Sequence, residues 1–244
     1  MNRQERDQLI ALAWDGEPAR EAGPRRALTV QQIVDAAVDL ADQSGLAAAS
    51  MPKLARALGV GTMSLYRYVP SKSVLIMLMV DSTAHPLPDD RPRDGCEWED
   101  AIRFYASSEL GRYQRHPWIL DVEVTDFPQT PGLLAWIDYG LGALASAGFD
   151  ESAKLGSLLL IDGHVAAVAR FYRNGHVADD ASSGTSEPPL DRLDSAHYTE
   201  LAQVIRAGGL DKDNFADYGY HYGLERIIAG IKQAQEQGPE PAVR

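Results

Sequence analysis

A closely spaced series of helix start and stop signals after residue 28 constrains the fold of this 244-residue chain more than any other feature. Thr29 can cap a helix, and Gln32 three residues later completes a capping box. Gly45 stands just beyond the last residue of the apolar period, where helices commonly end. Ser50 and Pro52 then mark the start of a shorter helix, because proline costs least in a first helical turn. The sequence therefore predicts a long helix followed by a short one.

A Gly-Val-Gly break at residues 59–61 separates that short helix from another one predicted over 62–68. Pro70 and Ser71 end the latter, and Ser71 can cap a further helix through 74–80. Two short helices joined by a turn of about three to four residues with glycine are typical of a helix-turn-helix. In that motif the second helix enters the DNA major groove with its N-terminal residues against base edges. The pattern therefore predicts a DNA-binding segment.

The candidate DNA contacts divide into residues that read bases and residues that hold phosphates. Thr62 and Ser64 carry hydroxyls at the start of the second helix, and Met63 between them can contact a thymine methyl group. Tyrosines and basic residues can reach phosphate oxygens, which fix the register without reading the sequence. Arg25 and Arg26 form a basic arm that either contacts DNA or only adds solubilising charge. The remaining predicted contacts are Ser50, Lys53, Tyr66, Arg67, Tyr68 and Lys72.

The stretch ALGVGTMSLYRYVPSK at residues 57–72 resembles the DNA-binding domain of the TetR family of repressors, and the resemblance extends over residues 29–72. It implies that Tyr66 and Lys72 contact phosphates and that residues 62–64 read bases. In the tetracycline repressor an arginine of the preceding helix also reads a base, and Pro52 stands there in this sequence. The implied operator therefore differs from the tetracycline operator.

The C-terminal part resembles the ligand domain of the tetracycline repressor more loosely, at residues 147–149, 163–164 and 222–231. The resemblance implies that two long helices, near 151–173 and 217–236, pair across a two-fold axis as a four-helix bundle. Such a dimer would place two reading helices one DNA turn apart, about 34 Å. The predicted dimer interface consists of Leu159, Val165, Val168, Leu224, Ile228 and Ile231.

No run alternates apolar and polar residues as a strand would, so the predicted fold is all-α with nine or ten helices. The predicted organisation is an extension with a basic arm at 1–27, a helix-turn-helix domain at 28–72, and a connecting helix with a Pro-rich linker at 73–97. A ligand-binding and dimerisation domain at 98–236 and a tail at 237–244 complete it. The extension includes a short helix at 4–14, and residues 174–195 are predicted to form a mobile loop because Gly, Ser, Pro and Asp dominate them.

The distribution of charge supports DNA binding near the N-terminus. The net charge is −12. Residues 1–80 carry nine Lys/Arg and eight Asp/Glu, whereas residues 81–244 carry 14 and 27. An acidic C-terminal part would repel phosphates and direct DNA to the other end. The longest uninterrupted apolar run has seven residues, at 74–80, and no secretory signal is visible, so we expect a cytoplasmic protein without a membrane partner.

Large aromatic residues of the C-terminal part suit a mostly apolar pocket for a small-molecule effector. For any one of them, packing in the core remains the alternative. The predicted ligand-binding residues are Trp98, Phe104, Tyr105, Tyr113, Trp118, Trp136, Tyr139 and His164.

Spacing argues against a metal, a cofactor and catalysis. No two of the six histidines lie three or four residues apart, and the single Cys96 cannot form a disulfide or a Cys-rich zinc site. The magnesium-binding histidine of the tetracycline repressor would fall near Ile119 or Leu120, whereas His116 is out of register. A GxGxxA match at 140–145 follows helical spacing with no preceding strand, so it does not predict a nucleotide site.

The pattern and the resemblance together predict a ligand-responsive transcriptional regulator that binds double-stranded operator DNA as a homodimer. The resemblance implies repression of a palindromic operator and release by a small hydrophobic or aromatic ligand. Two alternatives remain open at this point: an all-α enzyme that uses the aromatic pocket, and a DNA-binding regulator without ligand control.

Overall fold

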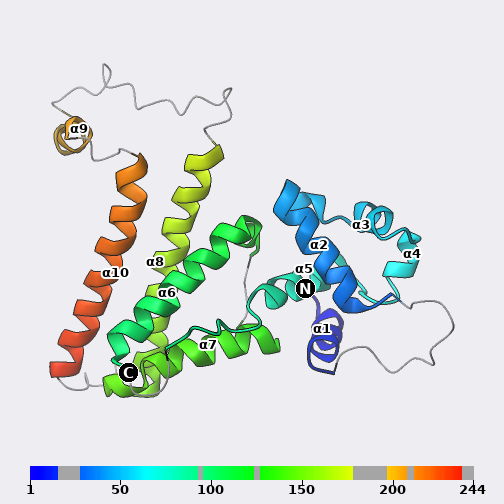
Figure 1. The fold of residues 1–244 in the computed structure, drawn as a ribbon, viewed down its shortest axis with the longest axis horizontal. Helices are drawn as coiled ribbons and strands as arrows, with labels where there is room; N and C mark the ends of the chain where they lie inside the picture. The colour runs from blue at the N-terminus through cyan, green and yellow to red at the C-terminus, as the bar shows by residue number, and fades with distance from the viewer. Residues whose placement is uncertain (16–27, 93–95, 124–126, 178–196, 208–211, 238–244) are drawn as a thin grey trace. The chain divides into compact units, whose positions relative to one another are not determined.

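The computed structural model describes residues 1–15, 28–92, 96–123, 127–177, 197–207 and 212–237. Within these ranges the chain forms ten α-helices and three short 3₁₀ helices and no strand, so the predicted all-α class is confirmed (Figure 1). Contacts divide the chain into two compact units, Met1–Ala145 and Ser146–Arg244. This division concerns packing, and the functional domain boundary proposed at 97–98 stays a prediction.

Six helical elements make up the N-terminal half of the first unit. They are α1 (Arg3–Asp15), α2 (Val30–Ser44), η1 (Leu46–Ala48), α3 (Met51–Ala57), α4 (Thr62–Leu65) and α5 (Lys72–Thr83). Their core includes Ile33, Leu54 and Leu65, all with no exposed surface, and α5 packs against both α1 and α2.

The predicted caps of this region are largely confirmed. The Thr29 hydroxyl accepts from the Gln32 N–H, and the Gln32 side chain accepts from the Thr29 N–H. The Ser71 hydroxyl accepts from the Val74 N–H at 3.2 Å. Ser50 occupies the N-cap position of α3, but its side chain makes no capping hydrogen bond.

Helix α4 is shorter than the predicted helix over 62–68. It ends at Leu65, and the next residues form turns, with the Tyr68 N–H bonded to the Leu65 carbonyl at 2.9 Å. Pro70 disfavours a helical conformation at the residue before it, which explains why α4 does not continue beyond a single turn.

The remaining elements of the first unit are α6 (Trp98–Arg115), η2 (Pro117–Asp121) and α7 (Pro131–Ala143), and η3 (Ala145–Ala147) spans the division between the units. Helices α6 and α7 pack on each other, and α7 also packs on α5. The first four residues of the GxGxxA match, 140–143, form the end of α7, Leu144 follows as a turn and Ala145 begins η3, so a helix and not a strand precedes the match as predicted.

The second unit contains α8 (Glu151–Val177), α9 (Thr199–Arg206) and α10 (Lys212–Gln237), and α8 and α10 run side by side (Figure 1). Because α8 continues to Val177, the predicted mobile loop is wrong for residues 174–177, and the rest of that prediction lies outside the described residues. The helix of residues 151–173 continues for four residues into the segment whose composition predicted a loop, which begins at Asn174.

One stretch of α8, Glu151–Arg173, is long and apolar enough to cross a membrane by length and composition alone. The sequence analysis considered only uninterrupted apolar runs and missed it. A core helix passes the same test, and α8 buries Leu158, Ile161 and Val165 while it packs against α10. This packing buries only one side of the stretch, and Leu159 and Leu160 on α8 stay exposed.

Candidate functional site

The reading segment, residues 50–72, consists of α3, a glycine turn, α4 and the start of α5. Gly59 has φ +67°, a backbone conformation that other L-residues rarely adopt, and the Val60 N–H bonds back to the Ala55 carbonyl at 3.0 Å. Leu54 and Leu65 anchor α3 and α4 to the core beneath the turn. The short helix α4 is therefore held from behind, with its other face turned to solvent.

The exposed face of α4 carries the three predicted base-reading residues. Met63 is 77% exposed, which is unusual for a large apolar side chain. Thr62 and Ser64 flank it and are partly exposed. Arg67 Nη2 donates to Ser64 Oγ at a long 3.4 Å, a weak contact that another acceptor can replace. The structure thus brings these side chains together on one small surface.

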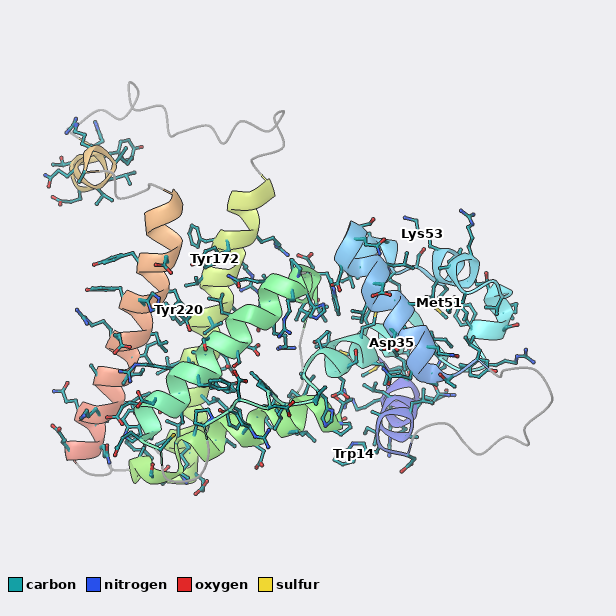
Figure 2. The ribbon with its side chains drawn as sticks, in the orientation of Figure 1. Trp14, Asp35, Met51, Lys53, Tyr172 and Tyr220 are labelled. Carbon is teal, nitrogen blue, oxygen red and sulfur yellow. The ribbon has the colours of Figure 1, made fainter. Side chains whose placement is uncertain are left out.

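The predicted phosphate contacts surround this surface. Tyr66 follows α4 and is 43% exposed, and Lys72 is the exposed first residue of α5. Lys53 on α3 is exposed and projects away from the helices behind it (Figure 2). Tyr68 is partly buried. The predicted arm, Arg25 and Arg26, lies outside the described residues.

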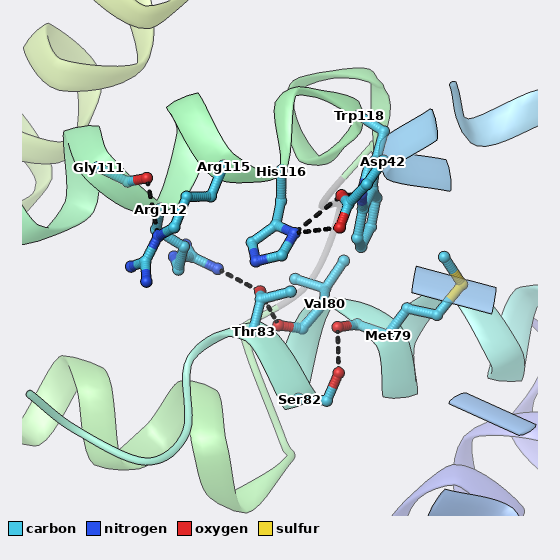
Figure 3. Close-up of polar contacts among 10 residues, drawn as sticks. All are labelled: Asp42, Met79, Val80, Ser82, Thr83, Gly111, Arg112, Arg115, His116 and Trp118. Atoms are coloured by element: carbon cyan, nitrogen blue, oxygen red, sulfur yellow. Dashed lines mark hydrogen bonds and ion pairs between the residues drawn. The ribbon is translucent and has the colours of Figure 1, made fainter. Parts of the chain in front are cut away.

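A second constellation joins the helix-turn-helix region to α6. His116 Nδ1 and Trp118 Nε1 converge on Asp42 of α2, with Oδ1 of the carboxylate 2.8 and 2.7 Å away (Figure 3). Trp118 is buried, so its indole N–H has exchanged water for this carboxylate. Asp42 therefore links α2 to the segment that follows α6.

A buried ion pair lies beside this link. Arg112 donates to both carboxylate oxygens of Glu109, at 2.6 and 3.0 Å, and both side chains are buried. Arg112 Nη1 also donates to Thr83 Oγ1 at 3.2 Å, at the C-terminal end of α5 (Figure 3). Burial opposes the charge of Arg112, but the Glu109 carboxylate outweighs it and raises the pKa of Arg112 above its ordinary value. Arg112 is therefore a cation that ties α5 to α6.

These connecting residues, which we call the polar joint, were missed by the sequence analysis. They are Asp42, Thr83, Glu109, Arg112, His116 and Trp118. Glu109 and Arg112 are three residues apart, the spacing of an ordinary surface ion pair on a helix, so spacing alone carries no signal of their burial.

Four of the predicted ligand-binding residues form an aromatic cluster on α6 and α7. Tyr105 stacks on Trp136 with ring centroids 5.2 Å apart, and Tyr139 lies 6.2 Å from Tyr105 and 6.4 Å from Phe104. Trp136 Nε1 and Tyr139 Oη are buried without a hydrogen-bond partner among the described residues. Burial raises the pKa of Tyr139 to about 12, so its hydroxyl stays protonated. Two buried polar atoms without a partner require an explanation, because buried polar groups in proteins are nearly always hydrogen-bonded.

The other four predicted ligand residues have different surroundings. Trp98 is buried at the start of α6. Tyr113 has the guanidinium of Arg112 5.4 Å from its ring centroid. The ring of Trp118 contacts the ring of His116, and the indole N–H of Trp118 donates a hydrogen bond to Asp42. Trp118 therefore belongs to the polar joint, and its contact with a ligand stays a prediction.

His164 belongs to the second unit and packs between α8 and α10. Its Nε2 lies 2.9 Å from the Tyr220 carbonyl oxygen, and its ring stacks on Tyr220. A side chain on Gly223 would overlap the His164 ring, so glycine permits this close approach. Tyr172 and Tyr220 come from these same two helices (Figure 2), and burial raises the pKa of Tyr220 to about 12. His164 has the contacts of a packing residue.

Five of the six predicted dimer residues are buried within the single chain. Leu159 alone is open to a partner, with 71% of its surface exposed. Helices α8 and α10 carry apolar residues on more than one face, and spacing does not tell which face meets the same chain, so the dimer interface stays a prediction. The buried residues are Val165, Val168, Leu224, Ile228 and Ile231.

In the part of the chain that the structure describes, no three His, Cys, Asp or Glu side chains are grouped as a metal would need. A helix-turn-helix near the N-terminus followed by a larger helical part defines a class of protein, the helix-turn-helix transcriptional regulators. Family models place the chain within that class. Residues 33–77 match the model described as bacterial regulatory proteins, tetR family, and residues 91–235 match the tetracyclin repressor-like C-terminal domain. The chain belongs to the TetR family of transcriptional regulators.

Relatives agree with this assignment and are regulators, not enzymes. The chain is 32% identical to the HTH-type transcriptional repressor DrrR1 of Streptomyces coeruleorubidus over 94% of this chain and 87% of that protein. It is similar to ligand-free ActR from Streptomyces coelicolor, with 25% identity, a TM-score of 0.70 and coverage of 86% and 99% of the two chains. ActR in complex with actinorhodin matches with 25% identity, a TM-score of 0.68 and coverage of 84% and 97%.

Proposed function

We propose that this TetR-family protein is a cytoplasmic, dimeric repressor that binds a palindromic operator and leaves it when a small aromatic ligand binds near α6 and α7. The observation that carries the DNA-binding part is the exposed α4 surface. Met63 would lose apolar exposure on contact with a thymine methyl group, and Thr62 and Ser64 would hydrogen-bond to base edges. Tyr66, Lys72 and Lys53 would hold the flanking phosphates.

The effector part rests on the aromatic cluster. A planar aromatic ligand would stack on such rings, and an oxygen acceptor on it would satisfy the indole N–H of Trp136. The neighbour ActR, solved in complex with actinorhodin, shows that a protein of this fold binds a small molecule. We infer the chemical class of the ligand from the cluster alone.

The polar joint offers a route from the ligand to the DNA. A ligand that displaces α6 would move Arg112, which holds Thr83 at one end of α5, and Lys72 stands at the other end. The same displacement would move His116 and Trp118 against Asp42 of α2. Because DNA geometry fixes the spacing of half-sites, a small movement of α4 costs affinity, and a coupling of about 1–3 kcal/mol is typical.

Dimerisation would use the exposed faces of α8 and α10. Leu159 and Leu160 stand there at 71% and 62% exposure, and small residues such as Gly156 and Gly163 leave room for a close helix. Leu159→Glu should therefore give folded monomers, as light scattering and circular dichroism would show. Leu224→Glu is the contrasting variant, because Leu224 is buried and a charge there should unfold the second unit. A dimer that survives Leu159→Glu would place the interface elsewhere.

The function as a whole is tested with DNA from upstream of the gene, labelled for fluorescence anisotropy at 50, 100 and 200 mM salt. Tight, sequence-selective binding that weakens with salt, and that Tyr66→Ala lowers, is expected. Selection from random sequences extends the test to distant operators. Failure of both with a folded dimer would refute DNA regulation, whereas DNA binding that no aromatic compound alters would favour a regulator without ligand control.

A further inference from the structure

A cavity of about 250 Å³ lies within the first unit, and residues from α1, α5 and the connection before α7 line it. Leu9 on α1 and Ile76 and Met77 on α5 form apolar walls, and Phe127 and Thr130 line it from the connection. None of the residues of the aromatic cluster lines this cavity. It is therefore a separate space from the proposed effector site.

Helix α1 forms one wall of this cavity, which is partly open to solvent, and α1 is attached at both of its ends. Asn2 and Glu5 form a reciprocal capping pair at its start. Hydrogen bonds from the Asn2 backbone and the Ser71 hydroxyl lower the pKa of Glu5, and Ser71 is the residue that caps α5. At its other end the Trp14 indole donates to the Gln129 carbonyl at 2.9 Å (Figure 2 labels Trp14). The wall formed by α1 is thus tied both to α5 and to the connection before α7.

Thr130 supplies a polar group at this cavity that nothing in the described chain satisfies. It is fully buried, and its hydroxyl has no hydrogen-bond partner. Thr130 is the N-cap residue of α7, where its hydroxyl would ordinarily accept from a first-turn N–H, but it does not do so. The Leu133 N–H donates instead to Asp81 Oδ1 of α5, at 2.8 Å. Asp81 has therefore taken the capping role and left the Thr130 hydroxyl for another partner.

We propose that this cavity is a second small-molecule site, which takes an uncharged aromatic compound of about two fused rings with one hydroxyl or carbonyl that hydrogen-bonds to Thr130. An apolar cavity of about 150 Å³ is enough for benzene, so the volume here suits a larger ring system. Arg6, Asp121 and Glu123 also line the cavity, and a ligand with a net charge would meet a like charge from one of them. A neutral ligand avoids that repulsion.

The test uses two probes that differ by one hydroxyl, 2-naphthol and naphthalene, in calorimetric titrations of the full chain without DNA. The unmodified protein should bind 2-naphthol more tightly than naphthalene. Thr130→Val keeps the shape of the side chain and removes the hydroxyl. It should weaken 2-naphthol binding about three- to tenfold, the usual worth of one net hydrogen bond, and leave naphthalene binding unchanged.

A variant that fills the cavity provides a second test of the proposal. Ile76→Trp adds volume at a half-buried wall residue and should abolish binding of both probes. Ile10→Trp is the matched control, since Ile10 is also half-buried on α1 but does not line the cavity, and it should bind as the unmodified protein does. Binding that persists in Ile76→Trp, or an equal loss of both probes in Thr130→Val, would overturn the proposal, as would no binding of either probe up to its solubility limit.

A consequence for regulation rests on the proposed function. A ligand in this cavity would touch α5, which carries Lys72, so 2-naphthol should change operator affinity in the unmodified protein and not in Ile76→Trp. The calorimetric titrations are done without DNA. A protein that did not bind an operator could therefore still bind 2-naphthol, and the two proposals are tested independently.

Discussion

The reading segment and the polar joint treat their polar side chains in opposite ways. In the reading segment, Ser64 and Arg67 share one long contact of 3.4 Å, and the large apolar side chain of Met63 is exposed. In the polar joint, Arg112 has three acceptor contacts and Asp42 accepts from two rings, at distances of 2.6 to 3.2 Å. In the reading segment, exposed hydrogen-bond donors and acceptors face solvent. In the polar joint, the donors and acceptors are hydrogen-bonded to one another within the chain.

This difference separates contact with a partner from transmission within the protein. Groups that must bind DNA have to exchange water for phosphates and bases, so strong internal partners would compete with the DNA. Groups that transmit a movement have to keep their partners, because a buried polar group that loses one is costly. Mutations in the two regions should therefore change different measurements, stability in the joint and DNA affinity in the reading segment.

The largest effect is expected from Arg112→Met, which leaves the buried Glu109 carboxylate without its cation. Removal of one partner of a buried pair costs about 3–5 kcal/mol of unfolding free energy, which urea denaturation would measure. The double variant Glu109→Leu with Arg112→Met should recover most of that loss, because no unpaired charge remains. If the single variant were as stable as the unmodified protein, the pair would not support the joint.

A smaller loss of stability is expected from Asp42→Ala. The buried Trp118 indole and His116 would lose their shared acceptor, at a cost of about 1–3 kcal/mol. Asp39→Ala is the control, because Asp39 is exposed on the same helix and its loss should cost less than about 0.5 kcal/mol. Asp42→Ala should also weaken the effect of an effector on operator affinity. Full coupling in this variant would exclude Asp42 from the transmission route.

Lys72→Ala tests the reading segment by its electrostatics and should leave thermal stability nearly unchanged. Each lost phosphate contact lowers the slope of log K against log salt by about 0.9, so a dimer should lose nearly two units. Arg103→Ala removes the same charge from the exposed surface of α6 and should not alter the slope. An unchanged slope in Lys72→Ala would show that this lysine is merely solvated.

The smallest effect is expected from Ser64→Ala. Loss of one hydrogen bond to a base edge should reduce discrimination at one position of each half-site by about fivefold, or roughly 1 kcal/mol, with little change at other positions. Binding to an operator library would measure it. An equal loss on every sequence would assign Ser64 to the phosphates.

Local rules explain which features were predictable. The capping box at Thr29, the cap at Ser71 and the absence of a strand before Gly140 follow from residues close in sequence, and the structure confirms each. The extent of α4 was overestimated because a helix four residues long depends on its surroundings more than on its own propensity. Burial of five predicted interface residues within the chain was not predictable, because both α8 and α10 have apolar residues on several faces.

The sequence by itself determined the all-α class, the helix-turn-helix pattern and the family, because these depend on periodicity, caps and a distinctive local motif. Only the tertiary structure decided that Asp42 receives His116 and Trp118, that Glu109 and Arg112 are buried, and that Asp81 replaces Thr130 as the cap of α7. The physical reason is distance along the chain. Partners 52 to 76 residues apart meet only when helices pack, and no short-range pattern records which carboxylate will reach which donor.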